Sequence, residues 1–237
     1  MGVSSQRQKN GWTYFAFEFL TVFAGVTIAF LLNTWNENQR DTRTETKILT
    51  EIRNGLQLDT GDIRVNINGH QWGIEACWYF RSLAYGTPVA DSLAEKNFTL
   101  LLRDFISIQN KSGYESLKSK GLELVSDDSL RLEIIGMYDY YFQVIEKLEE
   151  HYVENQFYET YFYVLSDLLS PHMDFDEKGH LVGFRQPIPL TAIERNRLLL
   201  YLAKIEFNRE FIIMNYREVE KNACDLISRI DEELKHR

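Results

Sequence analysis

The densest group of potentially reactive side chains in the sequence lies in residues 172–180, HMDFDEKGH. The letters DFDEKG match the opening D-x-D-x-x-G of a calcium-binding loop. However, Lys178 occupies the position of a third oxygen ligand, and Arg185 occupies that of the bidentate glutamate. The two histidines and an aspartate could bind zinc chemically, although their spacing follows no zinc motif. We therefore expect a solvent-exposed turn here, without a metal or another cofactor.

Glu18 is the second candidate, because it is the only charged residue in the apolar run 15–32, FAFEFLTVFAGVTIAFLL. An ionisable side chain within a bilayer is a candidate for function. Gly25 and Ala29 share its helical face and form a small-xxx-small pair, which allows another helix to approach closely. Two interpretations remain open: a site for helix packing or ion coupling, or a carboxyl group that simply reaches the membrane interface.

Ten aromatic residues lie between Tyr138 and Tyr163. Aromatic side chains bury large apolar areas and usually form core. Tyr140, Tyr141 and Phe142 are adjacent in an expected helix, so they point in different directions and cannot all face one core stripe. We therefore consider these three residues candidates for a partner-facing patch.

The sequence lacks the usual signatures of catalysis. It contains no G-x-S-x-G, P-loop, H-E-x-x-H or Cys-x-x-Cys motif, and its paired acids lie in helical charge runs. We expect that the protein is not an enzyme. The net charge of −9 and the absence of a basic stripe also argue against nucleic-acid binding, which requires clustered lysine and arginine.

Cys77 and Cys224 are the two cysteines of the chain, and their wide separation forms no metal motif. In an oxidising compartment they could form a disulfide if their Cα atoms came close enough. Otherwise they are two buried thiols. The sequence leaves both alternatives open.

The apolar run 15–32 determines where we expect the protein to lie. As a helix its 18 residues are about 27 Å long, close to the roughly 30 Å hydrocarbon core of a bilayer. Trp12, Tyr14 and Trp35 flank it, as aromatic residues do at membrane interfaces. The run exceeds the apolar core of about 7–15 residues in a cleaved signal peptide. We predict an uncleaved signal anchor, with a short tail (1–14) inside the cell and the domain outside.

Residues 33–237 are expected to form a helical extramembrane domain. Apolar residues at helical spacing predict a long helix from Ile48 to Cys77. A cap at Ser126 or Asp127 predicts a second long helix over 128–169. Residues 172–190 are a loop or a small hairpin, because DEKG lies between apolar residues.

Three pairs of residues match the capping box, S/T-x-x-E, and predict helix starts: Ser92 with Glu95, Ser112 with Glu115, and Thr191 with Glu194. The last pair opens a helix with a near-heptad stripe that continues to Leu234. Stripes on helices of about 40 residues suit antiparallel coiled-coil packing. We therefore predict an all-α fold: one transmembrane helix followed by an elongated bundle with long antiparallel coiled-coil-like helices.

The sequence VTIAFLLNTWNENQR, followed by KILTEI, resembles a large family of bacterial single-span membrane proteins with a domain of unknown function. The family's membrane-exit signature, I-A-x-x-x-N-x-W-N-E-x-x-R, falls on Ile28, Ala29, Asn33, Trp35, Asn36, Glu37 and Arg40. The segment GYESLKSKGLELVSDDSLRLEIIGMYDYY is similar to the family's second pattern, Y-x-x-L-x-x-x-G before a helix start. These segments cover about the first 60 residues and part of the middle. The resemblance implies an inner-membrane anchor and a helical domain on the envelope side, and it supplies no activity or cofactor.

The exit signature also has a physical interpretation. Asn33, Asn36 and Glu37 lie on one helical face where the chain leaves the bilayer, and Trp35 suits the interface. Polar groups at that depth require hydrogen-bond partners. Lipid headgroups and a neighbouring helix are the two alternatives.

Three functions agree with these features. The first is a membrane-anchored envelope protein acting through protein–protein contacts, as a scaffold, accessory or assembly subunit. The second is a homo-oligomeric channel or ion-coupled subunit that uses Glu18 in the span. The third is a ligand sensor that signals through a partner, because the tail is too short to form an output domain. The expected partners are the lipid bilayer and either further copies of the chain or another membrane protein.

Overall fold

The computed structural model describes residues 7–236, with side chains from Trp12 onward, and its fold is mostly helical. The chain divides into two units, Met1–Ile48 and Leu49–Arg237. Helix α1, Arg7–Ala84, contributes to both units. The other elements belong to the second unit and are η1 (Asp91–Leu93), α2 (Ala94–Leu102), α3 (Ser112–Lys120), η2 (Leu122–Leu124), α4 (Asp128–Gly136), η3 (Met137–Tyr141), α5 (Phe142–Glu150), η4 (Val153–Asn155), α6 (Phe157–Leu169), η5 (Ser170–His172), β1 (Met173–Phe175), β2 (Leu181–Phe184) and α7 (Ala192–Lys235).

The first unit consists of the N-terminal part of α1. Every side chain from Trp12 to Leu32 is exposed, and none of the apolar window is covered by described residues. The hydroxyl of Thr21 donates a hydrogen bond to the carbonyl oxygen of Phe17 at 2.8 Å, so this polar group is satisfied inside the helix. The chain therefore has an N-terminal helix that is long and apolar enough to cross a membrane.

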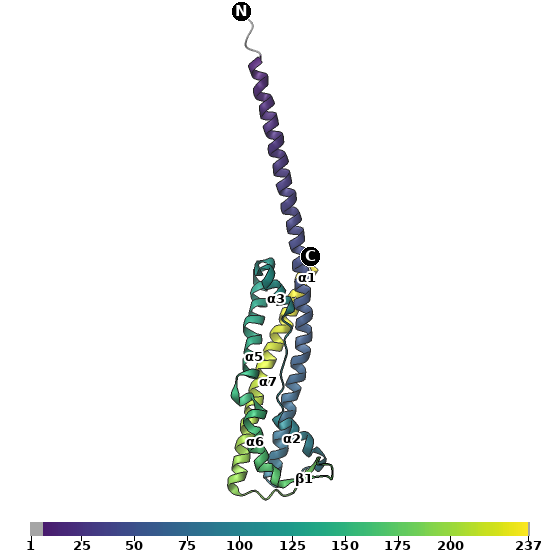
Figure 1. The fold of residues 1–237 in the computed structure, drawn as a ribbon, viewed down its shortest axis with the longest axis vertical. Helices are drawn as coiled ribbons and strands as arrows, with labels where there is room; N and C mark the ends of the chain where they lie inside the picture. The colour runs from purple at the N-terminus through teal and green to yellow at the C-terminus, as the bar shows by residue number, and fades with distance from the viewer. Residues whose placement is uncertain (1–6, 237) are drawn as a thin grey trace, which may run out of the picture. The chain divides into compact units, whose positions relative to one another are not determined.

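The second unit is built on the antiparallel pairing of α7 with the later part of α1 (Figure 1). Near one end of this pair Arg53 lies 3.0 Å from Asp231, and near the other end Arg81 binds Glu206. Residues early in α1 thus pair with residues late in α7. The fold is thus mostly helical, as predicted, and the long helices that pack together are α1 and α7.

The structure corrects the predicted long helix over 128–169, which is divided into α4, η3, α5, η4 and α6. Between α5 and α6, the buried Asn155 donates from Nδ2 to the carbonyl oxygen of Leu148 at 3.0 Å. Asp104 accepts the backbone N–H of Phe157 at 2.7 Å. These bonds satisfy backbone groups left free at two helix ends. Periodicity does not reveal the break, because apolar residues continue on both sides of it.

Two of the predicted helix caps are present in the structure and two are not. Thr191 and Glu194 form the expected capping box, and Asp127 caps α4 through the backbone N–H three residues later. Ser92 and Ser112 do not cap helices. Ser92 lies inside the 3-10 turn η1 and Ser112 is already the first residue of α3, so each stands one position away from the N-cap.

The predicted hairpin is present. Strands β1 and β2 pair antiparallel, with Met173 opposite Phe184. Gly179 in the turn has a φ of 84°, a conformation that glycine adopts without steric cost. The hairpin is the two-stranded sheet of an otherwise helical domain.

Candidate functional site

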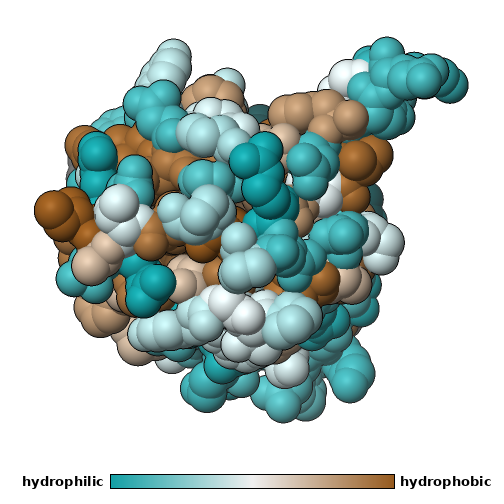
Figure 2. Space-filling model, turned by 90° about the horizontal axis from the view of Figure 1, so that it is seen from below, coloured by the Kyte–Doolittle hydropathy of each residue, from teal (hydrophilic) through white to brown (hydrophobic). Residues whose placement is uncertain are grey.

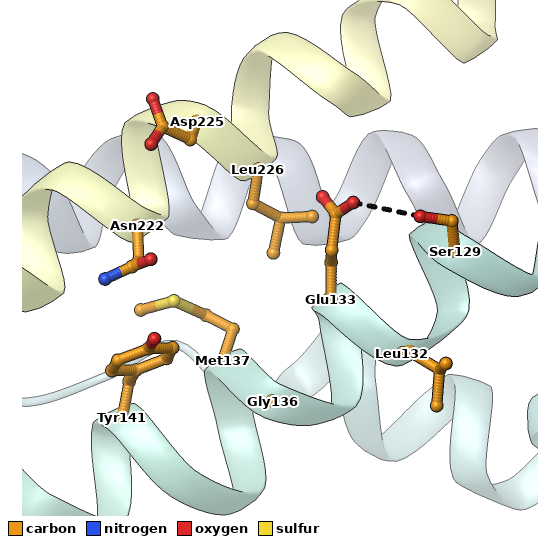
Figure 3. Close-up of a pocket in the computed structure, with 9 residues that line it drawn as sticks. All are labelled: Ser129, Leu132, Glu133, Gly136, Met137, Tyr141, Asn222, Asp225 and Leu226. Carbon is orange, nitrogen blue, oxygen red and sulfur yellow. Dashed lines mark hydrogen bonds between the residues drawn. The ribbon is translucent and has the colours of Figure 1, made fainter.

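A groove lies between the segment formed by α4 and η3 and the C-terminal half of α7 (Figure 3). Its volume is about 510 Å³. It is lined from the first segment by Ser129, Leu132, Glu133, Gly136, Met137 and Tyr141, and from α7 by Asn222, Asp225 and Leu226.

The groove exists because of two local features of the first segment. Nothing lies within 4 Å of the position that a Cβ atom would occupy at Gly136, so this helix position is open. The π-helical turn η3 follows at once and widens the helix. Met137 and Tyr141 project from this turn toward Asn222 of α7 (Figure 3). Single π-helical turns inside α-helices are frequent at functional sites, which makes this groove the candidate site.

The rim of the groove is polar and its floor is apolar. Ser129 donates to Glu133 at 3.3 Å, and Glu133 also lies 3.7 Å from Arg229 (Figure 3). Asp225 lies 3.1 Å from Lys221. Each rim carboxylate therefore has a charged partner within the chain. The arrangement offers apolar area between neutralised charges, which suits a segment of another protein.

Of the three aromatic residues considered for a partner-facing patch, two reach the surface and one is buried. Tyr141 lines the groove, and Tyr140 is 62% exposed. Phe142 is fully buried, so its assignment as a partner-facing residue is wrong. Tyr138 lies one helical turn earlier and is also buried, with its ring centroid 5.3 Å from that of Phe142. Both rings face the core, because the helix turns them away from Tyr140.

The candidates in the apolar helix are all exposed. No side chain between Trp12 and His236 covers Glu18, Gly25 or Ala29, and nothing described lies within 4 Å of a Cβ atom built at Gly25. Their face is open to another helix.

At the membrane-exit signature, Asn33 donates from Nδ2 to Glu37 at 3.1 Å, one turn later. Trp35 and Asn36 are exposed. The amide and carboxylate thus satisfy each other partly within the helix, and the remaining polar groups of the signature face outward.

The polar cluster at 172–180 contains a carboxylate that forms hydrogen bonds within the turn of the hairpin. Asp176 accepts the backbone N–H groups of Lys178 and His180 at 2.9 and 2.8 Å, and these bonds hold its pKa below the usual range. Among the described residues no group of three or more His, Cys, Asp or Glu side chains is placed to hold a metal ion.

Both cysteines are free. Cys77 is buried, and burial raises the pKa of its thiol to about 12. A thiol that stays protonated at neutral pH is a poor nucleophile.

Sequence reasoning missed a buried polar network between α1, α2 and α7. Arg209 is fully buried and donates to the carbonyl oxygens of Leu101 and Arg103 at 3.0 Å each, and to Nδ1 of His70 at 3.0 Å. The arginine therefore satisfies the C-terminal end of α2, which ends at Leu102. Burial lowers the pKa of Arg209 to about 10, and it lowers the pKa of His70 well below its usual value.

Two glycines of α1 make room for this network. A Cβ atom at Gly73 would lie 2.3 Å from Nε of Arg209, and one at Gly69 would lie 2.3 Å from the ring of Phe105. Glycines four residues apart on one face of a long helix are the signal that could have indicated a close approach.

Residues 103–111, which we call the strap, connect α2 to α3 without regular structure and lie against α1. Three carboxylates hold the strap by its backbone: Asp59, Asp62 and Glu149 accept, at 2.9, 3.2 and 3.1 Å, the N–H groups of Asn110, Ile108 and Ser107. The hydroxyl of Tyr216 also donates to Glu149. Burial raises the pKa of Asp59 to about 6 and that of Glu149 to about 7. Both carboxyl groups therefore titrate near neutral pH. They lie beneath the strap, where their hydrogen bonds hold the strap in the folded chain.

Comparisons of the chain with protein-family models, with curated proteins and with solved structures find no match. The functional proposal therefore rests on the geometry of the chain. Of the candidates, the groove is the place where open space, apolar area and a helix distortion coincide.

Proposed function

We propose that this chain is a single-pass inner-membrane protein whose periplasmic helical domain acts through protein–protein contacts, as a scaffold, accessory or assembly subunit. The observation that carries the proposal is the open groove at η3, with its apolar floor and paired rim charges. A groove of this kind accepts an apolar segment of a partner without leaving a buried charge unpaired.

The N-terminal helix supports the membrane part of the proposal. Its apolar side chains from Phe15 to Leu32 are exposed throughout. Leaving apolar surface in water costs about 25 cal/mol per Å², so a bilayer is the environment in which this helix is stable. The I-A-x-x-x-N-x-W-N-E-x-x-R resemblance agrees with this location.

The test fills the groove without disturbing the core. A leucine at Gly136 would project into the open space, so the Gly136→Leu chain should fold normally and lose its partner. Gly61→Leu is the matched control, because nothing lies within 4 Å of a Cβ atom there either and Gly61 lies outside the groove.

The measurement is the mass and composition of the particle that the full-length chain forms when it is extracted from its own membrane in mild detergent. We expect the wild-type and Gly61→Leu chains to retain a second protein subunit, identical or different, and Gly136→Leu to release it. A wild-type chain that is monomeric without a co-purifying protein would contradict the proposal. Extraction from the membrane by alkaline carbonate alone would contradict the anchor.

A second candidate, a homo-oligomeric channel or ion-coupled subunit, is favoured by the open face at Gly25. Glu18 lies on that face, two turns earlier. If identical spans pack there, Gly25→Leu should prevent assembly and Glu18→Gln should alter conductance in reconstituted bilayers. Unchanged assembly and conductance in both variants would exclude this candidate.

A further inference from the structure

Helix α1 exposes large apolar side chains within the second unit, on the face opposite its buried one. Leu58, Val65 and Trp72 are 67, 62 and 46% exposed. They follow one another at intervals of seven residues, which is the spacing of a coiled-coil seam. Together with the residue four positions before each of them, which is also exposed, they form a stripe that we call the α1 seam: Asn54, Leu58, Gly61, Val65, Asn68 and Trp72.

The strap extends this apolar surface on one side of the seam. The backbone N–H of Ile108 donates to Asp62 at 3.2 Å. Asp62 stands four residues after Leu58 and three before Val65, so it is the neighbour of both on the helix surface. Ile108 is itself 82% exposed, and Ile106 is 57% exposed. Apolar side chains of the strap therefore reach the surface next to those of the seam.

The seam lies along one side of the domain. Figure 1 shows the later part of α1 at an edge of the second unit, with α5 and α7 on its other side. The end of the domain where α7 begins has a different surface, on which apolar residues are scattered between hydrophilic ones (Figure 2). The groove is lined by residues of α4, η3 and α7, so the seam on α1 is a separate surface.

The residue types of the seam show what can cover it. All six positions are uncharged, so two copies of the seam can face each other without bringing like charges together. Asn54 and Asn68 carry amides, which both donate and accept hydrogen bonds. Each can therefore bond to the same residue of another copy, and an asparagine buried in a coiled-coil seam fixes its register. The seam is complementary to itself when equal residues meet.

The membrane anchor determines the direction of such a pair. The apolar run 15–32 and the seam belong to one helix, α1. Two copies anchored in the same bilayer therefore present their seams in parallel, and a two-fold axis parallel to the helices brings each residue opposite its own counterpart. The seam extends over 18 residue steps, or about 27 Å of helix. Anchoring in one bilayer raises the effective concentration of the seams, so this length is sufficient.

We propose that the α1 seam packs against the α1 seam of a second copy of this chain, as a parallel two-stranded coiled coil with both anchors in the same bilayer. Leu58, Val65 and Trp72 then each meet their own counterpart, and Ile108 of each copy covers one flank of the contact. Gly61 leaves the layer between Leu58 and Val65 incompletely filled, so the pair can separate. The inference rests on the anchor of the proposed function and names an identical chain as one partner.

Cysteine cross-linking tests the direction and register of the pair. In a Cys224→Ser background, the Asn54→Cys and Asn68→Cys chains are oxidised separately in native membranes. We expect a disulfide-linked dimer from each of them, because only parallel helices in register bring both positions opposite themselves. Tyr163→Cys is the control and should stay monomeric, since Tyr163 is 73% exposed on α6, away from the seam. Absence of a dimer from either seam variant, or cross-links to a different protein alone, would overturn the proposal.

Two substitutions should change the affinity of the pair in opposite directions, as measured by light scattering of the full-length chain in mild detergent. Gly61→Leu fills the open layer beside Val65, and leucine and valine in these positions favour two parallel strands. It should strengthen self-association at least tenfold. Val65→Glu places two like charges opposite each other and should weaken it at least tenfold, whereas Tyr163→Glu should leave it unchanged. Weaker self-association of Gly61→Leu would overturn the coiled-coil packing.

The outcomes separate this inference from the proposed function. A particle that holds a different protein but gives no cross-link at position 54 or 68 would overturn the inference and leave the proposed function intact. The Gly136→Leu chain should keep the cross-link after it has released the subunit bound at the groove. A cross-link that disappears in Gly136→Leu would mean that the groove binds the second copy, and it would overturn the seam assignment. A wild-type monomer without any partner would overturn both proposals.

Discussion

Two regions of the domain depart from the usual arrangement in which charged side chains are exposed and large apolar side chains are buried. Beneath the strap, the charged groups of Asp59, Glu149 and Arg209 are buried. On the outer face of α7, large apolar side chains such as Phe207 are exposed. Asp59, Glu149 and Arg209 each form hydrogen bonds within the chain, whereas the described residues leave the ring of Phe207 68% exposed. The buried polar groups therefore stabilise the fold of one chain, and the exposed apolar side chains of α7 add little to its core.

The largest effect is expected at the centre of the polar interior. Arg209→Met keeps the approximate volume but leaves the carbonyl oxygens of Leu101 and Arg103 without their donor. An unsatisfied buried group costs about 1–3 kcal/mol, so we expect the free energy of unfolding to fall by roughly 2–4 kcal/mol, because loss of the buried charge offsets part of the cost. Urea denaturation of the full chain in mild detergent, followed by circular dichroism, measures it.

Arg217→Met is the control for that experiment, because Arg217 is an exposed arginine of the same helix. Its effect should stay within about 0.5 kcal/mol. Equal effects of the two substitutions would show that the buried arginine does not stabilise the end of α2.

The next effect concerns pH. The pKa of Glu149 is raised from 4.5 to about 7, so the folded chain holds a proton there that the unfolded chain releases. This group contributes stability below pH 4.5, and the contribution is lost as the pH rises through about 7, by roughly 3 kcal/mol in total. Asp59, with a pKa raised to about 6, acts in the same direction.

His70 acts in the opposite direction, because its lowered pKa means that the unfolded chain takes up the proton. Its contribution is complete above about pH 6.5 and is lost as the pH falls below that value. Glu149→Gln isolates the carboxyl from this background. The unfolding free energy of wild type minus that of the variant should decrease between pH 4.5 and 8, and a difference independent of pH would refute the assignment.

A smaller effect distinguishes the true helix caps from the false ones. Thr191→Ala removes both halves of a capping box and should cost about 1 kcal/mol. Ser112→Ala should cost almost nothing, because Ser112 makes no cap bond to α3. The urea midpoints of the two variants measure the difference, and a larger loss for Ser112→Ala would contradict the cap assignment.

This contrast also explains how much of the fold the sequence could predict. The stripes of α1 and α7, the hairpin and the cap at Thr191 depend on neighbours a few residues away, and local patterns predicted them. The break before α6 depends on Asp104, which is 53 residues from its bonding partner Phe157. Arg209 reaches the last turn of α2 across 108 and 109 residues. No local pattern contains such contacts.

The groove was only partly predictable for the same reason. Tyr141 was a candidate because three adjacent aromatics cannot share one face, and it does line the groove. Which of the three faces inward depends on the π-helical turn, which interrupts the helix predicted over 128–169. The prediction for Phe142 is wrong for this reason, and no local pattern indicates the opening at Gly136.

The smallest effect is expected at Phe207, an exposed apolar residue of α7. Phe207→Ser should change the free energy of unfolding by less than about 0.5 kcal/mol, because the ring is already 68% exposed. Urea denaturation of the full chain in mild detergent measures the change. A large loss would mean that Phe207 belongs to the core of the chain, and the distinction between the two regions would fail at that residue.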